Sequence, residues 1–348
     1  MDEAAADAFA ERMLDTVLSA MEMMSVYVGD RLGLYRVLGA ETPWSVEAFA
    51  TAAGLHPRYA REWLEQQAVA GVLRVAADGG FVLPAAHADV LADPSSLRFS
   101  PPFARLAHAA AARMPELLSA YRDGGGVTWA QFGEDARDAQ GDANRPWFER
   151  ELAGALAGVP EVAAALERDG ARIADIGCGH GWSTIALARA NPGAEVVGVD
   201  IDAASLQAAR DHGADVPNLA FALTAGADLP AHGPFDAAFV FEALHDMPDP
   251  VGVLAGIRRA MRPDGVVVVM DEAVAEAFAP DGDEIERTMY AYSLFICLPD
   301  SMSTPGSVAT GTVMRPATLE RYAREAGFGG VDVLPIDGFA AFRFYRLR

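Results

Sequence analysis

The sequence of 348 residues contains no lysine, and all 27 of its basic residues are arginines. The absence of lysine excludes a Schiff-base enzyme and any phosphate-binding loop that depends on a lysine. Cysteine is also scarce: Cys178 and Cys297 are the only two, they lie far apart, and neither has a Cys or His at metal-ligand spacing. We therefore expect neither a disulfide scaffold nor a thiolate zinc site.

Long hydrophobic runs are missing as well. No window approaches the roughly 20 apolar residues that a membrane-spanning helix needs, and the acidic N-terminal segment lacks the pattern of a secretory signal. We therefore expect a cytoplasmic protein with no membrane partner. Hydrophobic residues nonetheless make up 51% of the chain, which is enough for a folded core and, at this length, for two domains.

The charge balance narrows the choice of partners. Acidic residues outnumber basic ones by 49 to 27, which gives a net charge of -22. The average field of such a chain repels a polyanion, so we expect no nucleic-acid partner.

Residues 7–40 are predicted to be helical, because apolar side chains recur there at steps of three and four. The segment holds more methionine than one buried stripe needs. These side chains fill a core or form a surface between subunits, and the sequence favours neither interpretation. The residues that carry the pattern are Met13, Leu14, Val17, Leu18, Met21, Met24 and Val28.

The next 45 residues predict a winged helix. A helix capped by Ser45, a second helix over Arg58–Ala70 and a hairpin over residues 72–83 follow one another. The second helix carries equal numbers of arginines and glutamates at its start, whereas a helix that reads the major groove has a basic face. We therefore expect the winged helix to pack and to form a homodimer.

We assign residues 1–150 to this mainly helical domain, with roles in dimerisation and in covering the substrate. Within it, the polar segment Gly133–Asn144 is predicted to be exposed. Residues 151–348 are assigned to a second domain.

Short apolar runs alternate with helical stretches from residue 171 onward, which predicts an α/β fold with a parallel sheet. The last two runs are separated by Asp337-Gly338, a hairpin signal, so the seventh strand should be antiparallel to the sixth. The predicted strands are Ile173–Ile176, Ala194–Val199, Leu219–Leu223, Asp236–Phe241, Val266–Met270, Val331–Ile336 and Phe339–Leu347.

A glycine-rich turn follows the first of these strands. The segment Asp175–Gly181 reads D-I-G-C-G-H-G, and its glycines let backbone amides approach a ligand at a helix N-terminus. The spacing G-x-G-x-G differs from the dinucleotide-binding G-x-G-x-x-G. Asp200 closes the second strand, where a carboxylate can bind two ribose hydroxyls.

These features resemble the class I S-adenosylmethionine (SAM)-dependent methyltransferases over about residues 160–348. Further matching residues are Asp228-Leu229-Pro230, Phe235-Asp236 and Met261–Gly265. The resemblance implies a Rossmann-like sheet of seven strands in the order 3-2-1-4-5-7-6, with the last strand reversed. The preceding winged helix is similar to small-molecule O-methyltransferases, and Phe241–Asp246 and Leu294–Ser301 are similar to a bacterial group of them.

The resemblance implies that SAM is the cofactor and S-adenosylhomocysteine (SAH) the product. It places Asp175, Gly177, Gly179 and Gly181 along the methionine part, Asp200 at the ribose and Ile201 on the adenine. The residue that should bond the adenine amine is replaced by Ala225, so Asp228 or a backbone carbonyl takes that role. Phe241 is a further candidate for a cofactor contact.

His245 and Asp246 follow the fourth strand, where the methyl acceptor must lie. In plant-type O-methyltransferases a His-Asp pair at this place supplies the base. The alternative is that His245 caps a helix. Glu272 or Asp271, at the end of the fifth strand, could orient the imidazole. If His245 is the base, the rate should fall as the pH drops through about 6.5. No metal is expected.

The segment Ala273–Arg315 is longer than an ordinary loop and is predicted to cover the acceptor with Tyr290, Tyr292 and Phe295. The sequence thus predicts a SAM-dependent methyltransferase that acts on a small aromatic or apolar molecule at oxygen. The alternatives are transfer to nitrogen or carbon on the same scaffold, and a SAM-binding winged-helix regulator of transcription.

Overall fold

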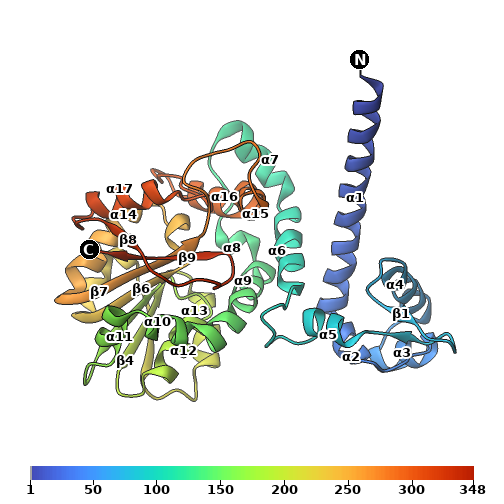
Figure 1. Ribbon diagram of the computed structural model, residues 1–348, viewed down its shortest axis with the longest axis horizontal. Coiled ribbons are helices and arrows are strands. Elements are labelled where there is room, and N and C mark those ends of the chain that lie inside the picture. The colour runs from blue at the N-terminus through green and yellow to red at the C-terminus, as the bar shows by residue number, and fades with distance from the viewer. Residues whose placement is uncertain (1) are drawn as a thin grey trace. The chain divides into compact units, whose positions relative to one another are not determined.

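The computed structural model describes residues 2–348, which form two compact units. The first ends at His108 and the second begins at Ala109 (Figure 1), so the division lies well before the predicted boundary at residue 150. Residues 109–150 belong to the second unit because they form hydrogen bonds and an ion pair with residues later in that unit. The Val127 amide donates to the Pro299 carbonyl at 3.0 Å, and Arg137 pairs with Asp202 at 2.6 Å.

The first unit begins with the long helix α1 (Glu3–Arg31), followed by the short helix α2 (Leu34–Leu38). The prediction of one helix over residues 7–40 is therefore wrong in one respect. The helical segment is interrupted at Gly33, whose φ of 67° lies in the left-handed region. The apolar stripe of α1 does not enter a core in this chain. Phe9, Leu14 and Met21 are among its exposed side chains.

The winged helix is confirmed. It consists of α3 (Val46–Ala53), α4 (Pro57–Val69) and the two-stranded sheet of β1 (Arg74–Val75) and β2 (Phe81–Val82). Ser45 caps α3 as predicted, because its hydroxyl accepts a hydrogen bond from the Ala48 amide at 3.2 Å. Helices α5 (Ala85–Leu91) and α6 (Pro101–Ala111) follow. The core of this unit includes Leu34, Tyr35, Leu38, Phe49, Trp63 and Leu64.

The second unit opens with α7 (Met114–Asp123) and α8 (Trp129–Phe132). Next comes one continuous helical run, made of α9 (Glu134–Trp147), the π-helical turn η1 (Phe148–Leu152) and α10 (Ala153–Ala157). The exposed segment predicted at Gly133–Asn144 is thus wrong, because it forms most of α9 and is largely half-buried. Helix α11 (Pro160–Leu166) leads into the sheet.

The seven-stranded sheet is confirmed in the order β5-β4-β3-β6-β7-β9-β8, which in chain order is 3-2-1-4-5-7-6. Strand β9 is antiparallel to both β7 and β8, as predicted. The connection before it spans residues 334–341 and is longer than the predicted two-residue hairpin. The strands are β3 (Arg172–Ile176), β4 (Glu195–Asp200), β5 (Leu219–Leu223), β6 (Phe235–Phe241), β7 (Met261–Glu272), β8 (Val331–Val333) and β9 (Phe342–Leu347).

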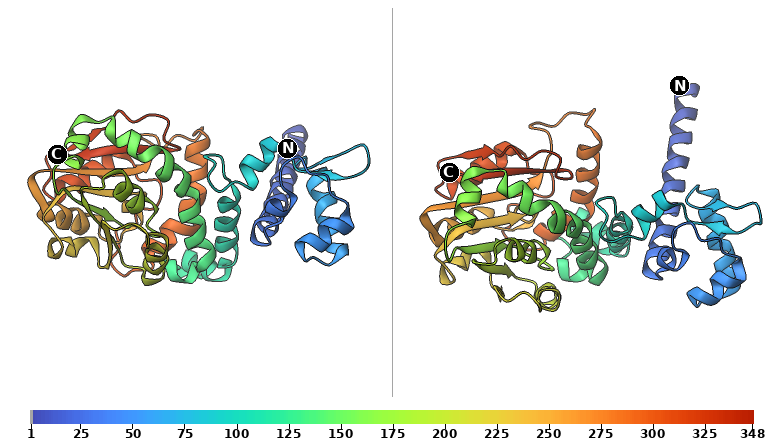
Figure 2. Two further views of the ribbon diagram at one scale, coloured as in Figure 1. Left: turned by 90° about the horizontal axis from the view of Figure 1, so that it is seen from below. Right: turned by 60° about the horizontal axis from the view of Figure 1, so that its bottom comes forward.

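Helices cover both faces of this sheet (Figures 1 and 2). One core packs η1, α10, α11 and α12 (Trp182–Ala190) against the sheet. The other packs α14 (Pro250–Ala260) and α17 (Pro316–Glu325) on the opposite side. Helix α13 (Ala203–His212) follows β4. With both faces covered, the carboxyl ends of the strands are the place where ligands bind such a fold.

The segment after β7 contains α15 (Glu284–Tyr292), the π-helical turn η4 (Ser293–Cys297) and α16 (Leu298–Met302). It packs within the second unit. The Tyr121 hydroxyl donates to the Leu294 carbonyl at 3.0 Å, and the Trp129 amide donates to Asp300 at 2.6 Å. Over residues 2–348, no helix has both the length and the hydropathy of a membrane span.

Candidate active site

The glycine-rich turn lies between β3 and α12, at the carboxyl edge of the sheet. Gly177, Gly179 and Gly181 have φ values of 73°, 50° and 78°. Residues that carry a side chain rarely adopt such values. At Gly177 the space is also closed, because a Cβ there would lie 2.7 Å from the Cβ of Ala243. The turn therefore needs glycine for its conformation and, at Gly177, for the close approach of the segment that follows β6.

Asp200 is held against this turn by backbone amides. Its carboxylate accepts hydrogen bonds from the amides of Gly179 and Asp202, both at 2.8 Å. Burial raises the pKa of Asp200 in spite of these bonds. The carboxylate is therefore fixed in position beside the glycine-rich turn, as a residue that orients a ribose must be.

Asp175 plays a different part in the geometry. It is buried, and one of its oxygens accepts hydrogen bonds from the hydroxyls of Ser183 at 2.6 Å and Thr184 at 2.7 Å. Burial raises the pKa of Asp175 to about 6. These contacts hold Asp175 to the first turn of α12, which directly follows the glycine-rich turn.

The other predicted cofactor residues fall into two groups. Ile201 follows Asp200 and is 73% exposed, which leaves its side chain available to a flat ring. Asp228 is exposed in the 3-10 turn η2 (Gly226–Ala231), which Ala225 precedes. Phe241 is only 5% exposed and packs between Phe148 and Phe239, so its ring belongs to the core.

These residues fit SAM. The turn leaves no room for a side chain at Gly177 and Gly181 and open space at Gly179. Asp200 is fixed beside it, and an exposed aliphatic side chain follows. Gly177–Gly181, Asp200 and Ile201 are the residues that would hold the cofactor.

His245 lies in the 3-10 turn η3 (Leu244–Asp246) and is 1% exposed. Its Nδ1 is 3.0 Å from one Asp271 oxygen and 3.2 Å from the other. The Oε2 of Glu272 is 3.2 Å from the same nitrogen, and the Oδ1 of Asp246 is 3.3 Å from Nε2. The predicted catalytic residues His245, Asp246 and Glu272 are thus brought together, and Asp271 holds the imidazole.

The charges in this cluster decide its proton affinity. Burial alone would lower the pKa of His245, but the carboxylates of Asp246, Glu272 and Asp271 outweigh it and hold that pKa well above 6.5. Burial raises the pKa of Glu272 well above its ordinary value and also raises that of Asp246. We therefore expect the midpoint of the pH dependence to lie above 6.5, because the value of 6.5 assumed an imidazole without carboxylates around it.

The same cluster offers cation ligands that the sequence did not indicate. The ligand atoms of His245, Asp271 and Glu272 lie within 4.8 Å of one another, as do those of His245, Asp246 and Cys297. Oxygens and a ring nitrogen at such spacing could coordinate a divalent ion. In the structure, Nδ1 and Asp271 are hydrogen-bonded to each other.

Glu242 is a site residue that sequence reasoning missed. It has a φ of 49°, unusual for a residue with a side chain. Asn144 donates a short hydrogen bond to its carboxylate. Burial raises the pKa of Glu242 to about 7, although Asn144, His245 and Gln140 each act to lower it. Its position directly after β6 was the one signal in the sequence.

Helix α9 touches the carboxyl edge at three places from a single face. Arg137 pairs with Asp202, Gly141 lies so close to His180 that a Cβ would be 2.9 Å from its ring, and Asn144 bonds Glu242. Residues at positions i, i+4 and i+7 share one side of a helix. The same side of α9 therefore contacts the segments after β4, β3 and β6.

The three predicted substrate residues are separated. Tyr292 is the one that is affected by a charge of the site. Burial raises the pKa of Tyr292 to about 12, and the negative charge of Glu242 raises it further. Tyr290 instead accepts a hydrogen bond from Arg315 at 3.2 Å, and its ring makes a T-shaped contact with the ring of Phe278. Phe295 lies in η4 and is exposed.

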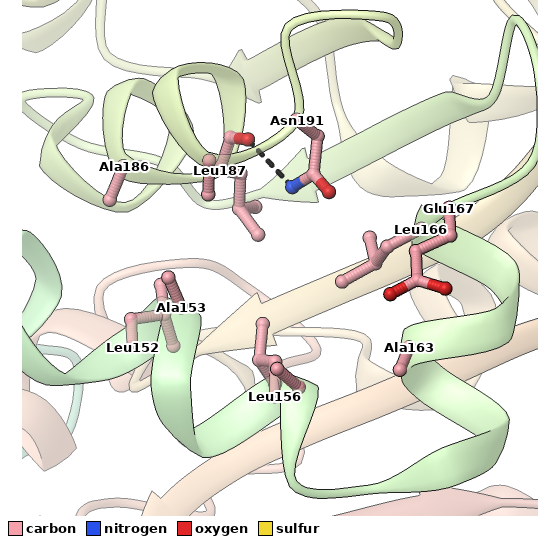
Figure 3. Close-up of a pocket in the computed structure, with 11 residues that line it drawn as sticks. Leu152, Ala153, Leu156, Ala163, Leu166, Glu167, Ala186, Leu187 and Asn191 are labelled. Atoms are coloured by element: carbon pink, nitrogen blue, oxygen red, sulfur yellow. Dashed lines mark hydrogen bonds between the residues drawn. The ribbon is translucent and has the colours of Figure 1, made fainter.

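An apolar crevice of about 270 Å³ lies elsewhere, between α10, α11 and α12 (Figure 3). Leu152, Leu156 and Leu187 line it, and the side-chain amide of Asn191 at its rim donates to the Leu187 carbonyl at 2.8 Å. Asn191 follows the C-terminus of α12, whereas the glycine-rich turn precedes its N-terminus. The crevice is therefore separate from the candidate site.

Comparisons with known proteins agree with this geometry. A family model described as a methyltransferase domain matches residues 167–319, and one described as an Rv2258c-like winged HTH domain matches residues 19–93. The ubiquinone biosynthesis O-methyltransferase of Methylococcus capsulatus is 31% identical over 176 residues, which are 49% of this chain and 66% of that protein. The counterpart from Xylella fastidiosa is 29% identical over 178 residues, with the same coverage. The matched part thus falls short of the relatives' full length.

Two solved structures resemble nearly the whole chain. Mitomycin 7-O-methyltransferase MmcR has a TM-score of 0.70 at 23% identity and covers 99% of each chain. Human N-acetylserotonin methyltransferase, solved in complex with SAM, has a TM-score of 0.71 at 18% identity and covers 97% of each chain. At these identities the likeness establishes the fold.

Proposed function

Because the chain combines a methyltransferase domain with a winged-helix domain, we propose that it transfers the methyl group of SAM to an oxygen atom of a small molecule. One observation carries the proposal. The glycine-rich turn with its amide-anchored Asp200 and the buried His245 cluster lie on the same carboxyl edge of one sheet. The relatives' names, which refer to ubiquinone biosynthesis, mitomycin and N-acetylserotonin, support an acceptor that is a small molecule.

SAM, when bound, supplies an electrophilic methyl group. A hydroxyl acceptor must lose its proton as it attacks, and His245 is the group that can take that proton, at Nε2. Asp271 accepts a hydrogen bond from Nδ1, which fixes the tautomer and the ring orientation. The neighbouring carboxylates then stabilise the imidazolium that forms.

Subunit association is part of the proposal. Helix α1 exposes a run of apolar side chains over most of its length, and an unpartnered apolar surface of this kind marks a protein interface. Beside α1, a groove of about 460 Å³ is lined by Val28, Leu32, Leu55 and Tyr59. A second copy of the chain that places its apolar stripe here would form a homodimer.

The proposal favours enzyme over transcriptional regulator. Arg58 pairs with Glu62, and Arg61 lies 3.5 Å from both Glu47 and Glu65. The basic side chains at the start of α4 are thus offset by acids, which leaves no basic face for the DNA major groove. Transfer to nitrogen or carbon stays an alternative, and it would be favoured if His245 were dispensable.

The function is tested by two measurements on the full chain. Calorimetry should detect SAM binding, and SAH formation should be followed with a panel of phenols, catechols, aliphatic alcohols and primary amines. We expect turnover with hydroxyl acceptors. Failure to bind SAM, or turnover with amines alone, would overturn the proposal.

A further inference from the structure

We propose that Glu242 is the counter-ion for the positively charged methionine end of the cofactor. The inference rests on the proposed function, because it takes SAM as the ligand of the glycine-rich turn. SAM carries a sulfonium and an ammonium in this part, and SAH keeps only the ammonium. Glu242 would thus be a cofactor-binding residue in addition to those that the family resemblance indicates.

The position of Glu242 follows from the sheet register. Strands β3 and β6 are neighbours, and Ile176 pairs with Val240. The residues directly after the two strands therefore lie side by side at the carboxyl edge. The clearance of a Cβ at Gly177 from Ala243 shows how close the two segments are. Glu242 directly follows β6 at this junction and precedes His245 by three residues.

The backbone of Glu242 supports a functional role. Its φ of 49° is unfavourable for a side-chain-bearing residue, and such conformations persist where the surroundings enforce them, often at ligand sites. The Glu242 amide donates to the Met270 carbonyl at 2.8 Å, and Asn144 holds the carboxylate. Two elements thus fix the side chain in a position that relaxed backbone would not choose.

The carboxylate of Glu242 has no positively charged partner of its own among the groups that face it. The groups that face its carboxylate are the amides of Asn144 and Gln140 from α9, His245 from η3, Asp271 and Glu272 from β7, and Tyr292 from α15. The imidazole is the one cation among these groups, and three other carboxylates surround it. Glu242 is half-buried, and a carboxylate that is partly removed from water without a cation of its own is costly in free energy. A cationic ligand at the adjacent turn would supply that charge.

The first experiment compares SAM and SAH affinities, by calorimetry at pH 7, in the wild type and in Glu242→Gln. The amide side chain keeps the shape and can still accept the Asn144 hydrogen bond. We expect SAM affinity to fall by about tenfold or more, the usual worth of a charge-assisted contact. A larger loss for SAM than for SAH assigns the carboxylate to the sulfonium, and an equal loss assigns it to the ammonium; either supports the proposal.

Glu195→Gln is the matched control, because Glu195 lies on the amino end of β4 and its side chain is exposed. That variant should bind both ligands as the wild type does. Unchanged SAM affinity in a Glu242→Gln protein with a wild-type circular dichroism spectrum overturns the inference, while the proposed function stands. If the wild type itself does not bind SAM, the proposed function fails first.

A second measurement uses the pH dependence of SAM binding. If the ionised carboxylate binds the cofactor and its pKa is about 7, titration of Glu242 should make the dissociation constant of SAM roughly eightfold larger at pH 6 than at pH 7.5. Glu242→Gln should lose this change, whereas any change due to Asp175 or Asp200, whose pKa values are also raised, should remain in the variant. Binding at pH 7 should also release part of a proton, which calorimetry detects in buffers of different ionisation enthalpy. A dissociation constant that does not change over this range contradicts the proposal, even if Glu242→Gln fails to fold.

Discussion

The two units of this chain place their side chains in opposite ways. The first unit leaves apolar groups on its surface, with Leu14 of α1 68% exposed. The second unit buries charge, since His245 and Asp271 are each 1% exposed. Both arrangements are unfavourable for an isolated folded chain, because exposed apolar surface and buried carboxylates each carry a cost in free energy.

The difference indicates what each unit binds. Apolar surface is stabilised by another apolar surface, so α1 suits a second protein chain. Buried carboxylates are stabilised by a hydrogen-bonded cation or by a proton, so the carboxyl edge of the sheet suits a charged ligand and proton transfer. The units can therefore be tested separately: changes in the second should alter chemistry and leave assembly intact, and changes in the first should do the reverse.

The largest effect is expected at His245. Replacing it by Asn should lower turnover by about 10²–10⁴, the usual worth of a general base. SAM affinity should change much less than turnover, because the glycine-rich turn does not use this side chain and His245 acts on Glu242 only through its charge. Steady-state kinetics with an identified acceptor and calorimetry with SAM measure the two effects. Near-normal turnover of His245→Asn would contradict the base assignment and favour proximity catalysis on an amine.

A smaller but clear loss is expected at Asp200, on the cofactor side of the same edge. Asp200→Ala removes the carboxylate that the Gly179 and Asp202 amides hold. Each charge-assisted bond to the ribose is worth about 1.5–3 kcal/mol, so SAM affinity should fall at least about tenfold. Asp215→Ala, at an exposed residue that pairs with Arg189, is the control. Equal SAM affinity in both variants would remove Asp200 from the cofactor site.

The pH dependence tests the cluster itself. The neutral imidazole is the base, and carboxylates hold the pKa of His245 above 6.5. Activity should therefore rise with pH through a midpoint above 6.5 and be lost below it. Asp271→Asn removes one negative charge beside the imidazolium, which lowers its pKa, so the midpoint should move to lower pH. A midpoint that stays in place, whatever happens to kcat, would show that Asp271 does not set the protonation of His245.

The smallest effect on chemistry is expected from α1. Replacing the exposed Leu14 and Met21 together by Glu should give a monomer, because charges then oppose an apolar interface, while SAM affinity stays within about twofold of wild type. Sedimentation and calorimetry provide the two readouts. Asp7→Asn, on the same helix, is the control. If the wild-type chain sediments as a monomer at micromolar concentration, the homodimer proposal is wrong.

The sequence predicted the parts of this structure that a short stretch of residues is enough to identify. Alternating strands and helices, the glycine-rich turn, Asp200 and the winged helix all have local signatures, and the structure contains each of them. It did not predict α9, whose sequence is mostly polar. The reason is physical: the buried side of α9 consists of small residues, Ala136 and Ala139, with Pro146, and its contacts with the loops are polar, so no stripe of large apolar side chains marks that side in the sequence.

The sequence identified the residues of the His245 cluster, but it did not predict their electrostatic properties. His245, Asp246 and Glu272 were identified by their positions after two neighbouring strands. The raised pKa of His245 could not be predicted, because it depends on how many carboxylates share one buried volume. Glu242 was missed for a related reason: its contact with Asn144 joins residues 98 positions apart.

The π-helical turn η1 has a consequence for the length of the chain at this point. Such a turn accommodates one more residue than an α-helix would. Deleting a single residue from Phe148–Leu152 would restore regular α-helical winding there. Because the wide turn absorbs that residue, the N-terminal half of the run would keep the same face toward the sheet edge, and the contacts of Arg137 and Asn144 would be retained. Deleting a second residue would leave no wide turn to absorb the loss. Each residue turns a helix by about 100°, so α9 would then rotate away from the sheet edge, and both contacts would be lost although neither residue had been changed.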